Sequence, residues 1–178
     1  MAPREQEEYR ALRATIRERG TARVWVFVAG IAAWAALTIA IAALASPPVA
    51  TLVPLLVLAA AFEGVFALHV GVERVGRYIQ VYFEGERGGW EHVAMAFGRP
   101  QGAAATDALF AVPFLLAALF NVAPALIAQP TGPELVFVGG SHALFVLRLV
   151  VARIAASKQR AIDLARFQEL RKQDTLSP

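Results

Sequence analysis

Cysteine is absent from this sequence, so disulfide bonds and thiolate metal sites are excluded. Charged residues are scarce at 17% of the chain, whereas about a quarter is usual for soluble domains. Lysine occurs only twice, and arginine supplies the other fifteen of the seventeen basic residues. The sequence also lacks a nucleophile elbow, a phosphate-binding glycine loop, a dinucleotide-binding motif and an HExxH zinc motif. No pattern therefore points to a common enzyme class.

Hydrophobic residues, in contrast, make up 57% of the chain, and the mean hydropathy is +0.52. They gather in four long segments, which span residues 24–45, 52–72, 105–128 and 135–152. At 1.5 Å of rise per residue, such segments can cross a hydrocarbon core about 30 Å thick. The pattern predicts an all-α fold, namely an integral membrane four-helix bundle. Residues 43–45 resemble a signal-peptidase site, but the apolar run before them is longer than a signal peptide uses, and cleavage there would leave three spans.

The placement of arginine predicts how the chain crosses the membrane. The two short loops at residues 46–51 and 129–134 contain no Lys or Arg, and basic residues stay on the cytoplasmic side. Both termini are therefore expected in the cytoplasm, with long cytoplasmic extensions of the second and fourth helices. The net charge of +3 fits an anionic inner leaflet as partner. The abundance of Arg and Ala favours a bacterial inner membrane.

We expect three parts along the chain: a cytoplasmic amphipathic segment at 1–22, a membrane domain at 23–157, and a cytoplasmic helix with a tail at 158–178. Gly20 is the predicted end of the first segment. Acidic residues interrupt its arginines throughout, so no nucleic-acid partner is expected. The membrane domain includes a cytoplasmic loop at 73–104, within which residues 90–97 predict a short interfacial helix. The small residues expected to let the first span pack closely are Ala29, Ala33, Ala36 and Ala40.

One acid and one base stand inside the predicted spans and require an explanation. Counted from the outer loops, Glu63 lies about 18 Å and Arg148 about 21 Å into the membrane. An ionised side chain at mid-span costs about 2.5–3.5 kcal/mol on the insertion scale, so a partner or a proton is expected. We predict a Glu63–Arg148 ion pair inside the bundle. It would fix the helix register or serve a proton or ion pathway; the third possibility is that the two do not pair.

Two further polar groups lie on the spans. His69 and Glu73 stand four residues apart and, with Asp107, form a possible metal site; the alternative is a charge ladder that continues to Arg77. Asn121 and His142 are both expected in the outer third of the membrane. They would hydrogen-bond across helices or line an outward cavity.

The last candidates lie in the cytoplasmic loop and on the extension of the second span. Glu84, Glu86, Glu91 and His92 surround a glycine-rich bend, which predicts a docking site, a metal site or a solvated acidic loop. Tyr78, Tyr82 and Phe83 are expected to pack against the extension of the fourth span rather than to bind a ligand.

Three functions fit these features. The first is a non-catalytic scaffold or accessory subunit that binds partner proteins through its cytoplasmic helices. The second is a transporter or channel protomer that uses Glu63 with Arg148 as counter-charge, and it requires a homo-oligomer because four spans enclose little room. The third is an intramembrane metal-dependent enzyme that uses His69, Glu73 and Asp107. The first of these needs no cofactor, and we expect none.

Overall fold

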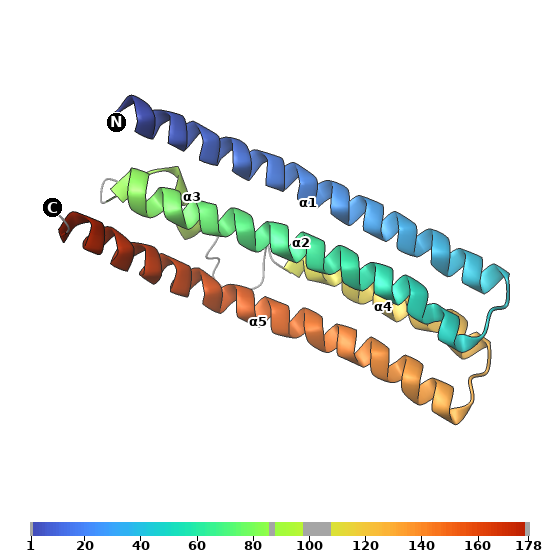
Figure 1. The fold of residues 1–178 in the computed structure, drawn as a ribbon. Coiled ribbons are helices and arrows are strands. Elements are labelled where there is room, and N and C mark those ends of the chain that lie inside the picture. The colour runs from blue at the N-terminus through green and yellow to red at the C-terminus, as the bar shows by residue number, and fades with distance from the viewer. Residues whose placement is uncertain (1, 86–87, 98–107, 177–178) are drawn as a thin grey trace. The chain divides into compact units, whose positions relative to one another are not determined.

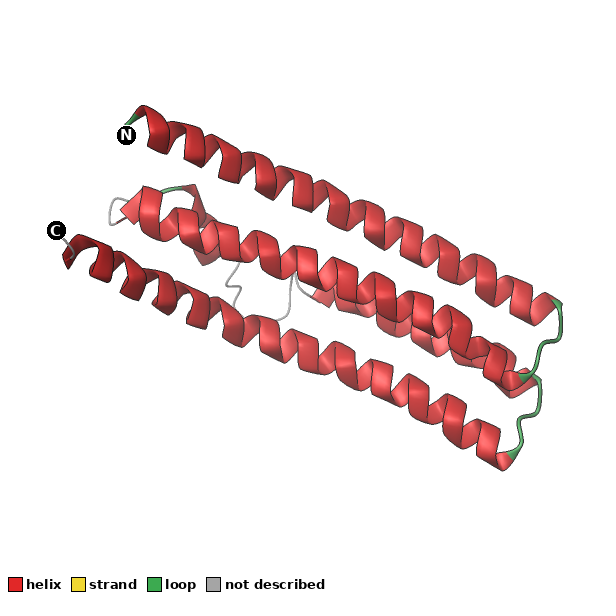
Figure 2. Ribbon diagram, viewed as in Figure 1, coloured by secondary structure: helices red, strands yellow, loops and turns green. Residues whose placement is uncertain are grey.

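The computed structural model describes residues 2–85, 88–97 and 108–176. Within these ranges every element is helical and none is a strand (Figure 2), which confirms the all-α prediction. Figure 1 shows the elements in chain order: α1 (Pro3–Ala43), η1 (Pro48–Thr51), α2 (Leu52–Ile79), η2 (Gln80–Glu84), α3 (Trp90–Phe97), α4 (Ala108–Ile127) and α5 (Gly132–Leu176).

Within the described ranges, three helices are long and apolar enough to cross a membrane: α1, the continuous helix Pro48–Glu84, and α5. They are compatible with a membrane protein. The apolar part of α4, Ala111–Ile127, is shorter among the described residues. The predicted third span begins at residue 105, which lies outside them.

Helix α1 corrects the prediction that the first helix ends at Gly20. It continues without a break from Pro3 to Ala43. A glycine inside a helix costs only about 1 kcal/mol relative to alanine, and good helix formers flank Gly20 on both sides. One weak breaker is therefore too little to end the helix.

The chain divides into two compact units, and α1, α2 and α5 each contribute residues to both. The apolar unit comprises residues 24–66 and the described part of 107–153. The charged unit comprises the described parts of 1–23, 67–106 and 154–178, so both ends of the chain belong to it.

Aromatic rings fill the centre of the apolar unit. The Phe62 ring of α2 meets the Phe114 ring of α4 edge-on at 5.4 Å between centroids, and the Phe145 ring of α5 at 6.3 Å. Phe27 of α1 meets Phe114 at 5.7 Å. Leucine, valine and alanine side chains of α2, α4 and α5 complete this core. Edge-on contact is a favourable geometry for aromatic pairs. These rings therefore join α1, α2, α4 and α5.

The first span packs through a different face from the one predicted. Ala29, Ala33, Ala36 and Ala40 are all exposed. The close approach is instead at Gly30, where a Cβ atom would collide with the Cβ atom of Ala61 on α2. Alanine is so frequent in α1 that its spacing did not identify the packed face.

Contacts within each unit fix the directions of the helices. In the apolar unit, Gly30 of α1 lies against Ala61 of α2 and Val26 lies against Gly64, so α1 and α2 are antiparallel there. In the charged unit, Glu73 of α2 pairs with Arg160 of α5, and Tyr82 further along α2 bonds Asp174 further along α5, so α2 and α5 are parallel there.

Candidate functional site

Asn121 is the most buried polar residue of the apolar unit, with 0% of its surface exposed. Its Oδ1 accepts hydrogen bonds from Trp34 Nε1 and Thr38 Oγ1 of α1, both at 3.2 Å. Its Nδ2 donates to the Thr51 carbonyl oxygen at 2.8 Å and to His142 Nε2 of α5 at 3.0 Å. All four hydrogen-bonding positions of the amide are therefore used, and each bond reaches a different segment or side chain. We call these residues the Asn121 node.

The Asn121 node also fixes the tautomer of His142. The Thr51 carbonyl can only accept, which orients the Asn121 amide with its NH₂ group toward Thr51 and His142. His142 Nε2 must then accept, so the ring proton is on Nδ1, which donates to the Val138 carbonyl oxygen at 2.8 Å. The predicted hydrogen bond between Asn121 and His142 is present. Because the amide has no free position, the geometry supports a tie between helices rather than a ligand site.

Glu63 and Arg148 are in contact, but on the outside of the apolar unit. Arg148 Nη2 donates to Glu63 Oε2 at 2.7 Å, and Arg148 Nε lies 2.7 Å from Oε1. The guanidinium also lies 5.4 Å from the centre of the Phe66 ring. The side chains are 47% and 41% exposed, respectively. The interior position predicted for this pair is thus wrong, because the core positions on α2 are taken by Leu58, Phe62 and Val65.

A second row of polar side chains crosses the charged unit. Arg23 Nη1 of α1 lies 2.9 Å from His69 Nδ1, and His69 Nε2 lies 3.7 Å from Glu73 Oε1. Arg160 Nε of α5 donates to Glu73 Oε2 at 2.7 Å. Both ring nitrogens of His69 thus face protein groups rather than an open coordination site.

These contacts bear on the metal site suggested for His69, Glu73 and Asp107. Asp107 lies outside the described residues. Among the residues that the structure describes, no three His, Cys, Asp or Glu side chains are grouped as metal ligands. Glu73 pairs with Arg160, so the row is a set of charge contacts that includes α5, whereas the predicted ladder ran along α2 alone.

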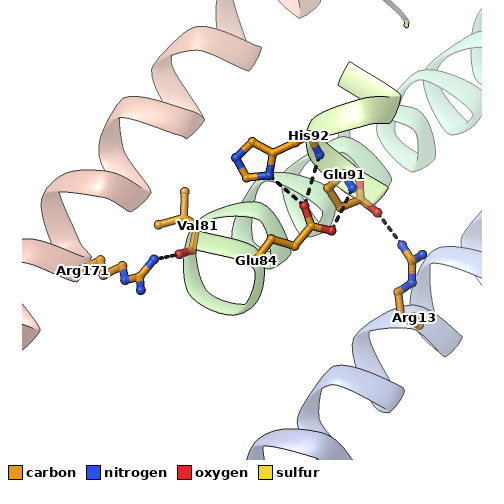
Figure 3. A network of polar contacts seen from close by, with 6 residues as sticks. All are labelled: Arg13, Val81, Glu84, Glu91, His92 and Arg171. Carbon is orange, nitrogen blue, oxygen red and sulfur yellow. Dashed lines mark hydrogen bonds and ion pairs between the residues drawn. The ribbon is translucent and has the colours of Figure 1, made fainter. Parts of the chain in front are cut away.

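Glu84 holds the start of α3 in place (Figure 3). Its carboxylate accepts hydrogen bonds from the Glu91 amide at 2.8 Å and the His92 amide at 3.2 Å, and it contacts His92 Nδ1 at 2.9 Å. A carboxylate at this point satisfies unpaired N–H groups and faces the positive end of the helix dipole. Burial raises the pKa of the Glu84 carboxyl, but the hydrogen bonds from Glu91 and His92 outweigh it, so the pKa is lowered overall. Gly89 makes the contact possible, because a Cβ there would lie 2.5 Å from Glu84 Cδ.

Two arginines from other helices complete the network in Figure 3. Arg13 of α1 pairs with the Glu91 carboxylate, and Arg171 of α5 donates to the Val81 carbonyl oxygen in η2. The cluster predicted as a docking site, a metal site or a solvated loop is therefore a helix cap with cross-helix contacts; Glu86, its fourth member, lies outside the described residues.

The aromatic residues at the end of α2 pack within the charged unit. Tyr78 meets Phe167 of α5 edge-on at 5.6 Å, and Tyr82 OH donates to Asp174 Oδ2 at 3.3 Å, as predicted for the α5 extension. Phe83 differs, because it contacts Tyr9 of α1 at 5.6 Å. Tyr78 OH donates to Glu8 Oε1 at 2.9 Å, and burial together with this carboxylate raises the pKa of Tyr78 to about 12.

The chain was compared with known protein families, sequences and structures. No protein-family model, no curated protein sequence and no solved structure matches this chain. Its function must therefore be inferred from its own geometry.

Sequence reasoning missed several members of these groups. Trp34 and Thr38 are two hydrogen-bonding side chains, four residues apart, in an otherwise apolar run, and this spacing was a usable signal. The capping role of Glu84 had a weaker signal, namely an acid separated by a glycine-rich bend from the start of a short helix.

Proposed function

We propose that this chain is a non-catalytic scaffold or accessory subunit of the plasma membrane. In this proposal it crosses the bilayer four times with both termini in the cytoplasm. The apolar unit is embedded in lipid, and the charged unit binds a partner protein from the cytoplasmic side.

The proposal that the apolar unit is embedded in lipid rests on the distribution of polar and apolar side chains in that unit. Apart from the Glu63–Arg148 pair, many of its outward side chains are apolar and strongly exposed: Ile39 is 69% exposed, Phe120 66% and Ile127 80%. Its most buried polar side chain, Asn121, is fully covered. A soluble protein rarely exposes so much contiguous apolar surface, whereas lipid is a suitable solvent for it.

The scaffold part rests on how the polar side chains are used. Asn121, Glu73 and Glu84 all bond to groups on other helices or helix ends. Such bonds hold helices together, and they leave little hydrogen-bonding capacity for a substrate. Glu63, the residue proposed for transport, faces outward rather than into the bundle of one copy.

The charged unit supports a binding role through apolar side chains that its own packing does not use. Ile162 is 58% exposed on the charged extension of α5, and Trp90 and Val93 of α3 are 65% and 63% exposed. Tryptophan is among the residues enriched at protein interfaces, where a few large side chains carry most of the binding energy.

A photo-crosslinking residue at position 162, compared with one at Ile79, tests the binding role in intact cells. Ile79 is fully buried in the same unit and serves as the matched control. We expect position 162 to give one discrete adduct with the same protein in repeated preparations, and position 79 to give none. If position 162 gave no adduct above the control, the partner-binding role would be wrong.

Measuring proton and cation flux in proteoliposomes distinguishes the scaffold function from the transporter function. Wild-type protein and the Glu63→Gln variant are reconstituted with a pH-sensitive dye and challenged with proton and cation gradients. A scaffold predicts no flux above empty liposomes for either protein. Flux in the wild type that is lost in Glu63→Gln would overturn the scaffold in favour of transport.

A further inference from the structure

The Glu63–Arg148 pair is exposed at a height where hydrocarbon is expected. Nearly half of each side chain is uncovered in one copy of the chain. The neighbouring exposed positions are apolar, with Ala60 on α2 and Leu144 and Val151 on α5. We call these five residues the ion-pair face.

Charged residues inside membrane segments almost always face protein or a water-filled cavity rather than lipid. The two bonds between Glu63 and Arg148 leave each carboxylate oxygen a further acceptor site. The guanidinium has five N–H groups, and the pair uses two of them. The remaining sites have no partner in lipid, so the ion-pair face is incomplete if the chain is a monomer in the bilayer.

We propose that the ion-pair face binds a second copy of this chain in the membrane. The inference rests on the proposed membrane topology. Two copies inserted with the same topology are related by a two-fold axis along the membrane normal, which keeps every residue at its own height. Glu63 and Arg148 lie at nearly the same height, at about 18 and 21 Å from the outer loops. Glu63 of each copy can therefore meet Arg148 of the other.

Charge and side-chain size support a second copy as the occupant. The face carries one charge of each sign, so it is neutral and complementary to itself. A lipid phosphate stays at the headgroup level, roughly half a membrane away from Glu63. Ala60 lies one turn before Glu63, and its small side chain allows another helix to approach closely.

Disulfide cross-linking in native membranes tests the face directly, because the wild-type chain has no cysteine to interfere. The Ala60→Cys variant is oxidised with copper phenanthroline. Leu119→Cys, at an exposed position of α4, is the matched control. We expect dimers at position 60 and none at 119. Equal cross-linking at both positions, or none at 60, would overturn the proposal.

Charge variants in the Ala60→Cys background test the role of the ion pair. Glu63→Gln with Arg148→Gln should abolish the dimer, and the exchanged pair Glu63→Arg with Arg148→Glu should restore it. Far-ultraviolet circular dichroism verifies that each variant remains helical. A dimer that persists in the neutral variant would refute the ion-pair interface. The topology is measured separately, by labelling the loops and termini of the single chain. Failure of the interface can therefore be told apart from failure of the proposed topology.

Discussion

At the scale of single residues, Asn121 is the clearest case in which one side chain joins the whole apolar unit. Its four hydrogen bonds reach α1, η1 and α5. Interhelical hydrogen bonds in membrane proteins contribute about 0.6 kcal/mol each on average. Removing the amide also leaves buried donors and acceptors unpaired, so the loss exceeds that of a single bond.

Replacing Asn121 by leucine should lower the free energy of unfolding by about 2–3 kcal/mol. Thr38→Val removes only one of the four bonds and should lower it by about 0.6 kcal/mol. Ser141→Ala is the control, since its hydroxyl bonds only the Phe137 carbonyl of its own helix. Unfolding in mixed micelles with increasing dodecyl sulfate measures all three. If Asn121→Leu were no worse than Ser141→Ala, the node would have no structural importance.

At the scale of elements, α3 depends on a residue outside itself. A helix of eight residues is too short to be stable alone, and Glu84 supplies the carboxylate at its N-terminus. Hydrogen bonds lower the pKa of Glu84 in the docked state. The docked state therefore binds fewer protons than the undocked state, and its stability falls as the pH falls through the lowered pKa.

The docking of α3 should thus be complete above the ordinary Glu pKa of 4.5 and weaken below it. Hydrogen exchange of the α3 amides, corrected for the intrinsic effect of pH, measures this. The Glu84→Gln variant should exchange faster already at neutral pH. Glu169→Gln is the control, because Glu169 is exposed and pairs only with Arg166 of its own helix. Equal protection of α3 in wild type and Glu84→Gln would contradict the capping role.

The elements also show what the sequence could and could not predict. Hydrophobic length identified the long helices, since apolar runs of this size have few alternatives. The rotation of α1 was predicted wrongly because its alanines, which lie on every side of the helix, were taken to mark the packed face, whereas Phe27, Gly30 and Trp34 mark it. The spacing of Trp34 and Thr38 was the signal that could have identified this face. Glu63 and Arg148 were paired correctly by height, but height carries no information on which face of α2 points to the core.

At the scale of the whole molecule, the proposed topology sets which parts of the chain face lipid and which face the cytoplasm. The loops at 46–51 and 129–134 are expected outside, and the charged ends of α1 and α5 inside. This arrangement sets the heights of Glu63 and Arg148 in the membrane. The proposed partner site on the charged unit and the proposed ion-pair face both depend on it.

Labelling of single cysteines in intact cells with a membrane-impermeant maleimide tests the topology most directly, because the chain has no cysteine of its own. We predict that Ser46→Cys and Thr131→Cys are labelled from outside. Glu5→Cys and Thr175→Cys should react only after the cells are opened. Labelling of either terminal cysteine in intact cells, to the level seen at Ser46→Cys, would contradict the account.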